Sequence, residues 1–373
     1  MLEGINLTLL IGPGLPVPAP SDVLDALDAV QVTSSTENSG FQLTFKIGKT
    51  SSLQTLIAAG YFDPITTRVI IIVTLNGMPN VIMDGVVTRQ ELTPSNDVGK
   101  STLTVTGEDL SRMMDLVEMP FMRWPIPVIG RVYAILAKYA VLGIAPVAIP
   151  PIIPDVPNPI DSIPSQTGTD LAYLRQLASQ AGYVFYVEPG PFPGESIAYF
   201  GPDIRVPVPQ PSLNVNMDTD SNVESLSFAF DGLAKKIVVV TIMDPVTKKI
   251  PIPIPVPNLD PLRPPMGVRL PVPSKVEFAE GMAAQGLTDA LNETIGIMFG
   301  ASDSITGSGS LDVLRYGQPL RSRMMVGVRG AGLAYDGLYY VNSVTHDIKL
   351  GQYKQNFSVS RDGLISSTPR VMP

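Results

Sequence analysis

Short runs of alternating apolar and polar residues lie at both ends of this chain and constrain its fold most. Val30–Ser35 and Phe41–Ile47 alternate with the period of a strand that has one buried face. Arg68–Leu75 is a β-branched run that ends in Asn76-Gly77, a strong hairpin signal, before Val81–Thr88 returns. Further strands are expected at Ile5–Ile11 and Ser101–Thr106. Residues 1–111 therefore predict a first β-barrel.

The middle of the chain changes to the period of a helix. Apolar residues at spacings of three and four predict helices over residues 110–117, 132–139 and 170–181. Thr169 is placed to cap the last of these helices, and Gly182 is placed to end it. An alternating strand follows directly. Residues 112–206 are therefore expected to form a small α+β domain.

The strand pattern resumes at residue 207. A second barrel is expected from residues 207–249 and 305–373, interrupted by a Pro-rich and helical insertion at residues 250–304. Proline at every second position of Ile250–Pro257 predicts an edge strand or a polyproline segment. A capping box at Ser274 predicts a helix that reaches about Met298. The fold class is thus α+β, mainly β, with two barrels around an α+β domain.

The composition argues against several kinds of function. Hydrophobic residues make up 45% of the 373 residues and charged residues only 16%, which suits large cores and permanent interfaces. A net charge of −8 opposes general nucleic-acid binding, which needs a basic surface. The absence of cysteine excludes disulfides and thiolate metal sites. No signal peptide is predicted, and the apolar stretch Tyr139–Pro154 is too short and too rich in proline for a membrane span.

No group of residues predicts catalysis. His346 is the only histidine, and its neighbour Asp347 would point to the opposite face of a strand, so a structural histidine is expected. Trp124 is expected to anchor a core or an interface, and Tyr183–Tyr186 to be a core strand. Two fragments of a phosphate-binding loop lack its first glycine and predict turns, namely Gly48-Lys49-Thr50 and Gly99-Lys100-Ser101. We expect no catalytic, cofactor-binding or metal-ligating residues and no cofactor.

Two stretches resemble the baseplate hub family of contractile tails. The first is Asp170–Ala178 followed by Gly182–Val187, and the second is Gly337–His346 with the strand that follows it. Weaker similarity lies in Asp84–Val87 and Thr106–Leu110. The family comprises the late control protein D group of phages, the hub portion of type VI spike proteins and the hubs of phage-tail-like injection systems. The residues that carry the resemblance are Asp170, Leu171, Leu174, Leu177, Ala178, Gly182, Tyr183, Gly337, Tyr339, Val341, Val344, His346, Gly351, Tyr353, Phe357 and Arg361.

The resemblance implies a structural protein of the virion or injection particle, located in the tail baseplate and assembled in the bacterial cytoplasm. Two tail-tube-like barrels per chain would give a homotrimeric ring of pseudo-sixfold symmetry, closed by pairing of edge strands. The implied partners are the inner tube or a tube-initiator protein, a separate trimeric spike protein and baseplate wedge components. The lumen would be acidic or neutral, so that DNA or effector cargo passes without specific nucleic-acid binding, and the chain would not insert into a membrane.

Two other functions stay open at this point. One is a cell-wall-degrading enzyme associated with the tail, for which the 34 acidic residues supply carboxylates but no recognisable pair. The other is a secreted β-rich adhesin, which fits the strand content but leaves the unit over residues 170–187 without an explanation. Activity on purified peptidoglycan distinguishes the enzyme, and an isolated surface monomer distinguishes the adhesin.

Overall fold

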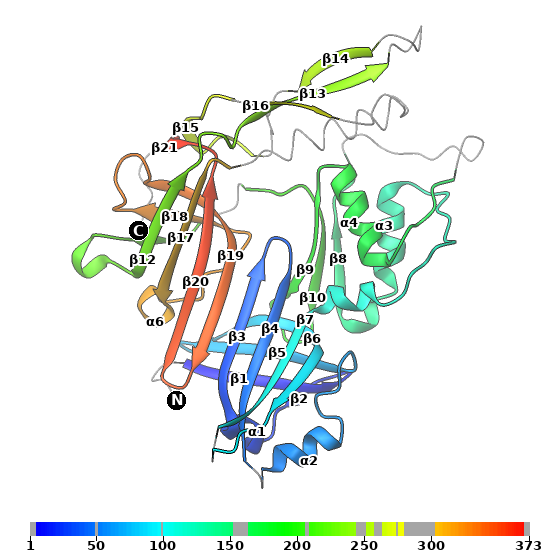
Figure 1. The fold of residues 1–373 in the computed structure, drawn as a ribbon, viewed down its shortest axis with the longest axis vertical. Coiled ribbons are helices and arrows are strands. Elements are labelled where there is room, and N and C mark those ends of the chain that lie inside the picture. Colours follow the sequence, from blue (N-terminus) through cyan, green and yellow to red (C-terminus); the bar gives the residue numbers. More distant parts are fainter. Residues whose placement is uncertain are drawn as a thin grey trace.

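The structure, a computed structural model, describes residues 5–48, 51–97, 100–151, 163–205, 209–243, 251–256, 263–273, 275–279 and 303–368. The described chain is mainly β, with two barrel-like units of mostly antiparallel strands and an α+β domain packed beside them (Figure 1). None of the helices in these ranges is both long and apolar enough to cross a membrane.

The first barrel follows the predicted alternation closely. Along β4 (Ser39–Ile47) Phe41, Leu43 and Phe45 are buried, while Gln42 and Lys46 are exposed. One face therefore packs into the core, and the other stays polar. The strand order is β3-β4-β7-β6-β5-β1-β2. The elements are β1 (Ile5–Pro13), β2 (Val17–Pro18), α1 (Ser21–Ala26), β3 (Leu27–Ser35), β4 (Ser39–Ile47), α2 (Ser52–Ala58), β5 (Thr67–Leu75), β6 (Met78–Thr93), β7 (Ser101–Asp109) and the 3-10 helix η1 (Leu110–Asp115).

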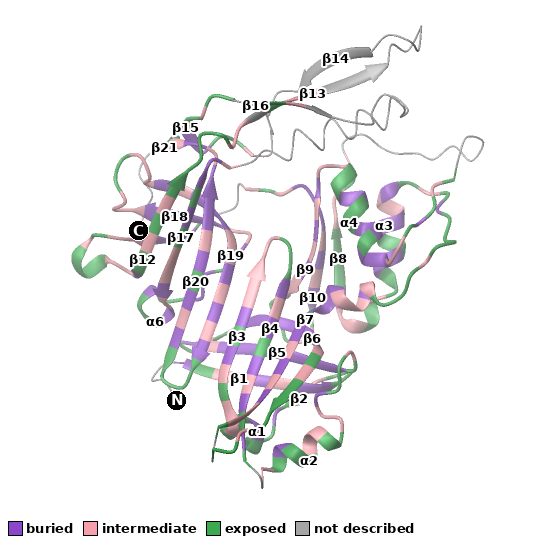
Figure 2. Ribbon diagram, viewed as in Figure 1, coloured by how far each residue is buried: buried purple, intermediate pink, exposed green. Residues whose placement is uncertain are grey.

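The second barrel has the strand order β12-β17-β20-β19, with β18 beside β19 and β11 beside β18. Buried and partly exposed residues alternate along β19 and β20 (Figure 2). The apolar faces of both barrels belong to one continuous core. The elements are β11 (Gln210–Asn214), η3 (Asp218–Asp220), β12 (Val223–Phe230), β17 (Ile305–Asp312), α6 (Val313–Tyr316), β18 (Met325–Arg329), β19 (Gly337–Lys349) and β20 (Gln352–Arg361).

The α+β domain has its own core between two helices and a three-stranded sheet of order β8-β10-β9. Thr169 caps the second helix as predicted, because its hydroxyl accepts a hydrogen bond from the Ala172 N–H. Gly182 follows this helix at a φ of 68°, a conformation that glycine adopts easily. The elements are α3 (Val128–Ala137), η2 (Ala140–Leu142), β8 (Ile144–Ala148), α4 (Asp170–Gln180), β9 (Val184–Pro189) and β10 (Ser196–Gly201).

The segment between β12 and β17 contains a separate sheet of order β14-β13-β16, which projects from the second barrel (Figure 1). The strands are β13 (Lys236–Met243), β14 (Pro251–Val256) and β16 (Lys275–Ala279); a further pair joins β15 (Gly267–Arg269) to β21 (Leu364–Ser366). Every second residue of β14 is proline, so the ladder to β13 must use the N–H groups of the other residues. The outer edge of β14 then offers carbonyls without donors, which protects it from further pairing.

Three expectations from the sequence are wrong in this structure. Residues 110–115 form a 3-10 helix in place of the expected α-helix over 110–117. Lys236–Met243 lies in the separate sheet and not in the second barrel, because it pairs with β14 and β16. Lys275–Ala279 is a strand and not the first turn of a helix, since parallel pairing with β13 overrides the capping signal; the rest of that expected helix lies outside the described residues.

Candidate assembly surface

The two barrels repeat the same arrangement of strands. The pairings β3-β4-β7-β6-β5 of the first barrel recur in the second as β12-β17-β20-β19-β18. A short helix follows the second strand of each set, α2 in one and α6 in the other. The chain is therefore built on a duplicated module, although the two copies show no clear repeat in sequence.

Two unusual backbone positions confirm that the modules correspond in detail. Ile65 has a φ of 69° and Arg323 a φ of 60°, a region that residues other than glycine seldom adopt. Each of these residues donates its N–H to the carbonyl just before a strand bulge, Ile65 to Val87 at 2.7 Å and Arg323 to Val341 at 2.8 Å. A turn with the same strained backbone thus precedes β5 in the first module and β18 in the second.

The modules join within the chain by edge pairing. After its bulge, β19 leaves β18 and pairs antiparallel with β3, with Thr345 opposite Thr33. The hydroxyls of these two threonines lie 3.2 Å apart, and Gln31 donates to Asp347 at 2.9 Å. The side chain of Arg323 donates to a β3 carbonyl at the end of the junction. Main-chain and side-chain hydrogen bonds together hold the two barrels in one sheet.

Each module also has an edge that no described strand covers. β12 ends the sheet and pairs only with β17 among the described strands. The part of β6 after Val87 pairs with β7 on one side and with no described strand on the other. Leu92 on this part is 51% exposed and Phe230 on β12 is 40% exposed. Unpaired backbone edges of this kind invite another strand.

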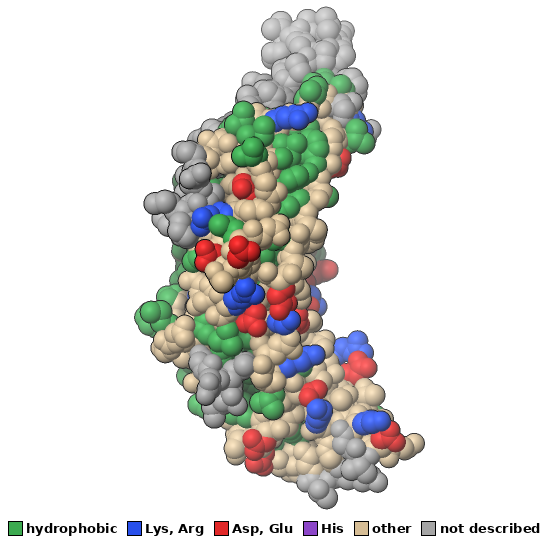
Figure 3. All heavy atoms as spheres, turned by 90° about the vertical axis from the view of Figure 1, so that its left-hand side faces the viewer, with side chains coloured by type: hydrophobic (Ala, Val, Ile, Leu, Met, Phe, Trp, Pro, Cys, Tyr) green, Lys and Arg blue, Asp and Glu red, His purple; other side chains and the backbone are tan. Residues whose placement is uncertain are grey.

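The eight central strands, in the order β12-β17-β20-β19-β3-β4-β7-β6, share one polar face. Its residues are mostly serine, threonine, asparagine and glutamine, and their side chains alternate with the buried core residues. Charges of both signs are interspersed, including Lys46, Glu108, Asp312 and Lys354. In the view from the side that carries β12, acidic and basic side chains likewise lie among each other beside hydrophobic patches (Figure 3). Such a face has no strong charge of one sign that would hold DNA.

Buried polar contacts fix the α+β domain against the barrels. Arg68 and Asp84 form two hydrogen bonds of 2.7 Å, and their side chains are 7% and 0% exposed. Ser196 of the α+β domain also donates to Asp84, at 3.2 Å. On the other side the guanidinium of Arg323 stacks 4.0 Å from the ring centre of Tyr186 and lies beside a cavity of about 380 Å³. Both barrels are thus tied to the middle domain.

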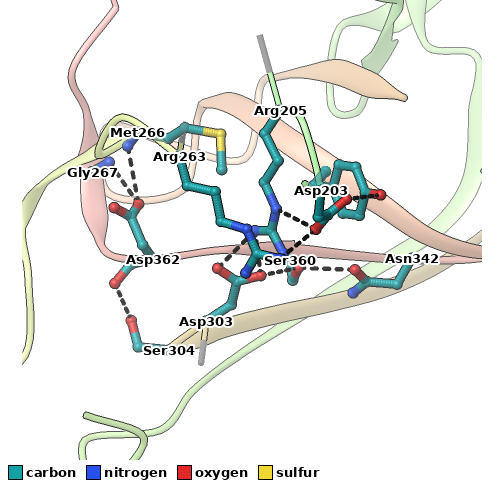
Figure 4. A network of polar contacts seen from close by, with 11 residues as sticks. Asp203, Arg205, Arg263, Met266, Gly267, Asp303, Ser304, Asn342, Ser360 and Asp362 are labelled. Atoms are coloured by element: carbon teal, nitrogen blue, oxygen red, sulfur yellow. Dashed lines mark hydrogen bonds and ion pairs between the residues drawn. The ribbon is translucent and has the colours of Figure 1, made fainter. Parts of the chain in front are cut away.

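A network of polar residues joins the insertion to the second barrel (Figure 4). Arg205 donates to both carboxylate oxygens of Asp303, at 2.9 and 2.7 Å, and it also lies beside Asp203. Arg263 pairs with Asp203 at 2.7 Å, and Tyr340 of β19 donates to the same carboxylate. The linker with Asp203 and Arg205, Arg263 of the insertion and the segment that leads into β17 are therefore held at one point of the second barrel.

Comparison with known proteins gives a consistent picture of the fold. No family model and no curated protein match the sequence. The structure is similar to that of a tail protein from Neisseria meningitidis MC58, with a TM-score of 0.62 and 13% identity over 97% of this chain and 98% of that one. It is also similar to the 43 kDa tail protein of prophage MuSo2 from Shewanella oneidensis, with a TM-score of 0.56 and 15% identity over 96% and 99% of the two chains.

This chain has the fold of the phage tail proteins. A third similar structure, the Francisella PdpA-VgrG complex, has a TM-score of 0.59 and 8% identity over all of this chain and 60% of that one. The similarity to the two tail proteins covers 97% and 96% of this chain. At these identities the similarity establishes the fold and leaves the function to be argued from the surface described above.

Within the tail-protein fold, the residues that carry the hub resemblance fall into two separate clusters. One is the α4 unit, where the carboxylate of Asp170 accepts hydrogen bonds from Lys138, Tyr139 and Gln166. The buried residues of this cluster are Leu171, Leu174, Leu177, Ala178 and Tyr183, followed in the chain by Gly182.

The other cluster is the β19–β20 hairpin. Arg361 is fully buried, stacks on Tyr339 and donates to two main-chain carbonyls of the preceding loop. Gly351 lies in the hairpin turn at a φ of 83°. The core residues of this cluster are Gly337, Val341, Val344, His346, Tyr353 and Phe357. The structure does not bring the two clusters together into one site.

Side chains that the sequence offered as candidates for catalysis or binding are part of the packed cores. His346 is buried, and its Nδ1 lies 2.7 Å from the Tyr353 hydroxyl, while Asp347 points to the opposite, polar face, as expected. Trp124 is 8% exposed in the core of the α+β domain and donates to Gln166 at 3.2 Å. Parts of both phosphate-loop fragments, residues 49–50 and Gly99, lie outside the described residues. Edge strands were expected to close a ring, but the sequence did not identify β6 and β12 as these strands, because strand order cannot be derived from alternation alone.

Proposed function

We propose that this chain is the structural baseplate hub of a contractile injection machine. Three copies form a ring of pseudo-sixfold symmetry that adapts a hexameric inner tube to a trimeric spike and lines the central channel. The observation that carries the proposal is the duplicated module with its junction inside the chain. A chain that already joins two modules edge to edge can join further modules in the same way, and three chains supply six modules.

The proposed partners follow from this geometry. One end of the ring contacts the inner tube or a tube-initiator protein, a separate spike protein binds the other end, and wedge components bind outside. The similarity to the PdpA-VgrG complex supports a place beside a spike component. The hub has no catalytic role in this proposal, and it functions in the tail baseplate after assembly in the bacterial cytoplasm.

The mass of the purified protein tests the proposal directly. Light scattering after size exclusion is expected to give three times the chain mass of 39.9 kDa, and averaged electron micrographs are expected to show six lobes around a hole. A particle with only twofold symmetry, or a monomer at every concentration, would contradict it. Incubation with purified peptidoglycan is expected to release no fragments; turnover that a single carboxylate substitution abolishes would favour an enzyme.

A further inference from the structure

The junction inside the chain shows which edges a second copy would pair. It joins β19 to β3, and the module correspondence makes β19 the counterpart of β6 and β3 the counterpart of β12. The free end of β6 and the free edge of β12 are therefore of the same two kinds as the edges joined inside the chain. One copy offers the end of β6, and the next copy offers β12.

Burial at equivalent positions supports this correspondence. Val30 and Val32 of β3 are 1% and 0% exposed beneath β19, whereas their counterparts in β12, Leu226 and Phe228, are only partly buried. His346 of β19 is 4% exposed, whereas its counterpart Leu92 of β6 is 51% exposed. The apolar residues are in place on the free edges, and only the neighbouring strand that would cover them is missing from the described chain.

The pairings within each module fix the register. The bulge in β6 after Val87 matches the bulge in β19 after Val341, so Glu91 corresponds to Thr345. β3 pairs with β4 as β12 pairs with β17. Aligning β4 with β17 through their partners β7 and β20 therefore makes Ala229 the counterpart of Thr33. Since Thr345 lies opposite Thr33 inside the chain, Glu91 is expected to lie opposite Ala229 across the contact between copies.

We propose that the end of β6 in one copy, residues 90–93, pairs antiparallel with residues 227–230 of β12 in the next copy, with Glu91 opposite Ala229. This inference rests on the proposed hub ring and specifies its subunit contact. Leu92 then faces Phe228 on the core side, and Thr93 faces Ser227 on the polar side, as hydroxyl-bearing residues do at the internal junction. One repeated junction closes the whole ring.

Cysteine crosslinking tests the register, because the natural chain has no cysteine. The double variant E91C/A229C is expected to form disulfide-linked dimers and closed trimers on mild oxidation, seen on a denaturing gel without reductant. T33C/T345C is the matched control, since it places the same pair at the internal junction and should oxidise within one chain. E91C/S227C, which is out of register by two residues, should crosslink at least tenfold less.

The outcomes separate this inference from the proposed function. Suppose that the wild-type protein is a trimer and T33C/T345C oxidises, but E91C/A229C gives no crosslinked dimers. The register is then wrong and the hub proposal stands. If the wild-type protein forms no trimer, the hub proposal itself fails. A second measurement does not depend on thiol geometry: L92E should raise the apparent dissociation constant of the trimer at least tenfold, whereas L350E, at a turn residue that is 89% exposed, should not.

Discussion

At the scale of single residues, the buried pair of Arg68 and Asp84 in the first barrel also holds the α+β domain, through hydrogen bonds to Gly194 and Ser196. D84A leaves the Arg68 guanidinium buried with only the Gly194 carbonyl as a partner, so we expect a loss of about 3–5 kcal/mol in the free energy of unfolding. Urea unfolding, monitored by fluorescence, measures this loss in the free energy of unfolding.

The exposed pair between Lys46 and Asp28 supplies the control for that measurement. D28A removes a carboxylate whose side chain is 41% exposed, and the loss is expected to stay below about 1 kcal/mol. Equal losses in the two variants would mean that burial does not decide the strength of these pairs.

His346 gives the fold a dependence on pH. Burial lowers its pKa from 6.5 to about 3, so the folded protein keeps it neutral while the unfolded chain binds a proton below about pH 6.5. Its stability contribution is present above pH 6.5 and falls as the pH drops toward 3, by up to about 1.4 kcal/mol per pH unit. H346N keeps an acceptor near Tyr353 but cannot titrate, so its melting temperature should fall less between pH 6.5 and 4. Parallel curves for both proteins would exclude this histidine as the cause.

At the scale of elements, Gly107 of β7 allows the sheet to pack against Phe41 of β4. A Cβ at Gly107 would overlap the Phe41 ring and the carbonyl of Val86. We expect G107A to lower the stability by about 1–3 kcal/mol, measured as a shift in the urea midpoint. G48A is the matched control, because a Cβ there meets no atom within 4 Å and should change stability little. A neutral G107A would show that the ring can move away.

The strands and the presence of two barrels could be predicted from the sequence, but the shared strand order of the two modules could not. Alternation locates β3 and β4 because each has one buried face. The modules fill equivalent space differently: Phe41 of β4 packs over Gly107, whereas the counterpart of Phe41 in β17 is Gly307, and Phe228 and Val359 fill the space beside it. Large and small residues have changed places, so a sequence comparison of the modules finds no repeat although their strand pairing agrees.

Partners that are distant in the chain also decide the structure near the insertion. Lys236–Met243 is as apolar and β-branched as a barrel strand, and only its pairing with β14 and β16 assigns it to a separate sheet. The strained turns at Ile65 and Arg323 carry no local signal, because neither residue favours a positive φ. Features that depend on partners far away in the chain were therefore beyond the sequence pattern.

At the scale of the whole molecule, the polar face of the eight central strands would become the wall of the channel. Its mixed charges and many hydroxyls let a polyanion pass without a strong bond, and the net charge of −8 adds a weak repulsion. In the proposed ring every change on this face would occur three times around one channel. Small changes of charge should therefore have large effects on DNA.

The double variant E108K/E224K is expected to convert this protein from one without measurable affinity for short duplex DNA into one that binds it. Both residues are exposed on the polar face, so the ring would gain six lysines and lose six carboxylates around one hole. Fluorescence anisotropy at several salt concentrations should show binding that weakens steeply as salt rises, because counterions are released. D22K/D25K makes an equal change in net charge on α1, away from the polar face, and should bind DNA far more weakly. Equal binding by the two variants would mean that net charge alone decides the affinity and that Glu108 and Glu224 do not face a shared channel.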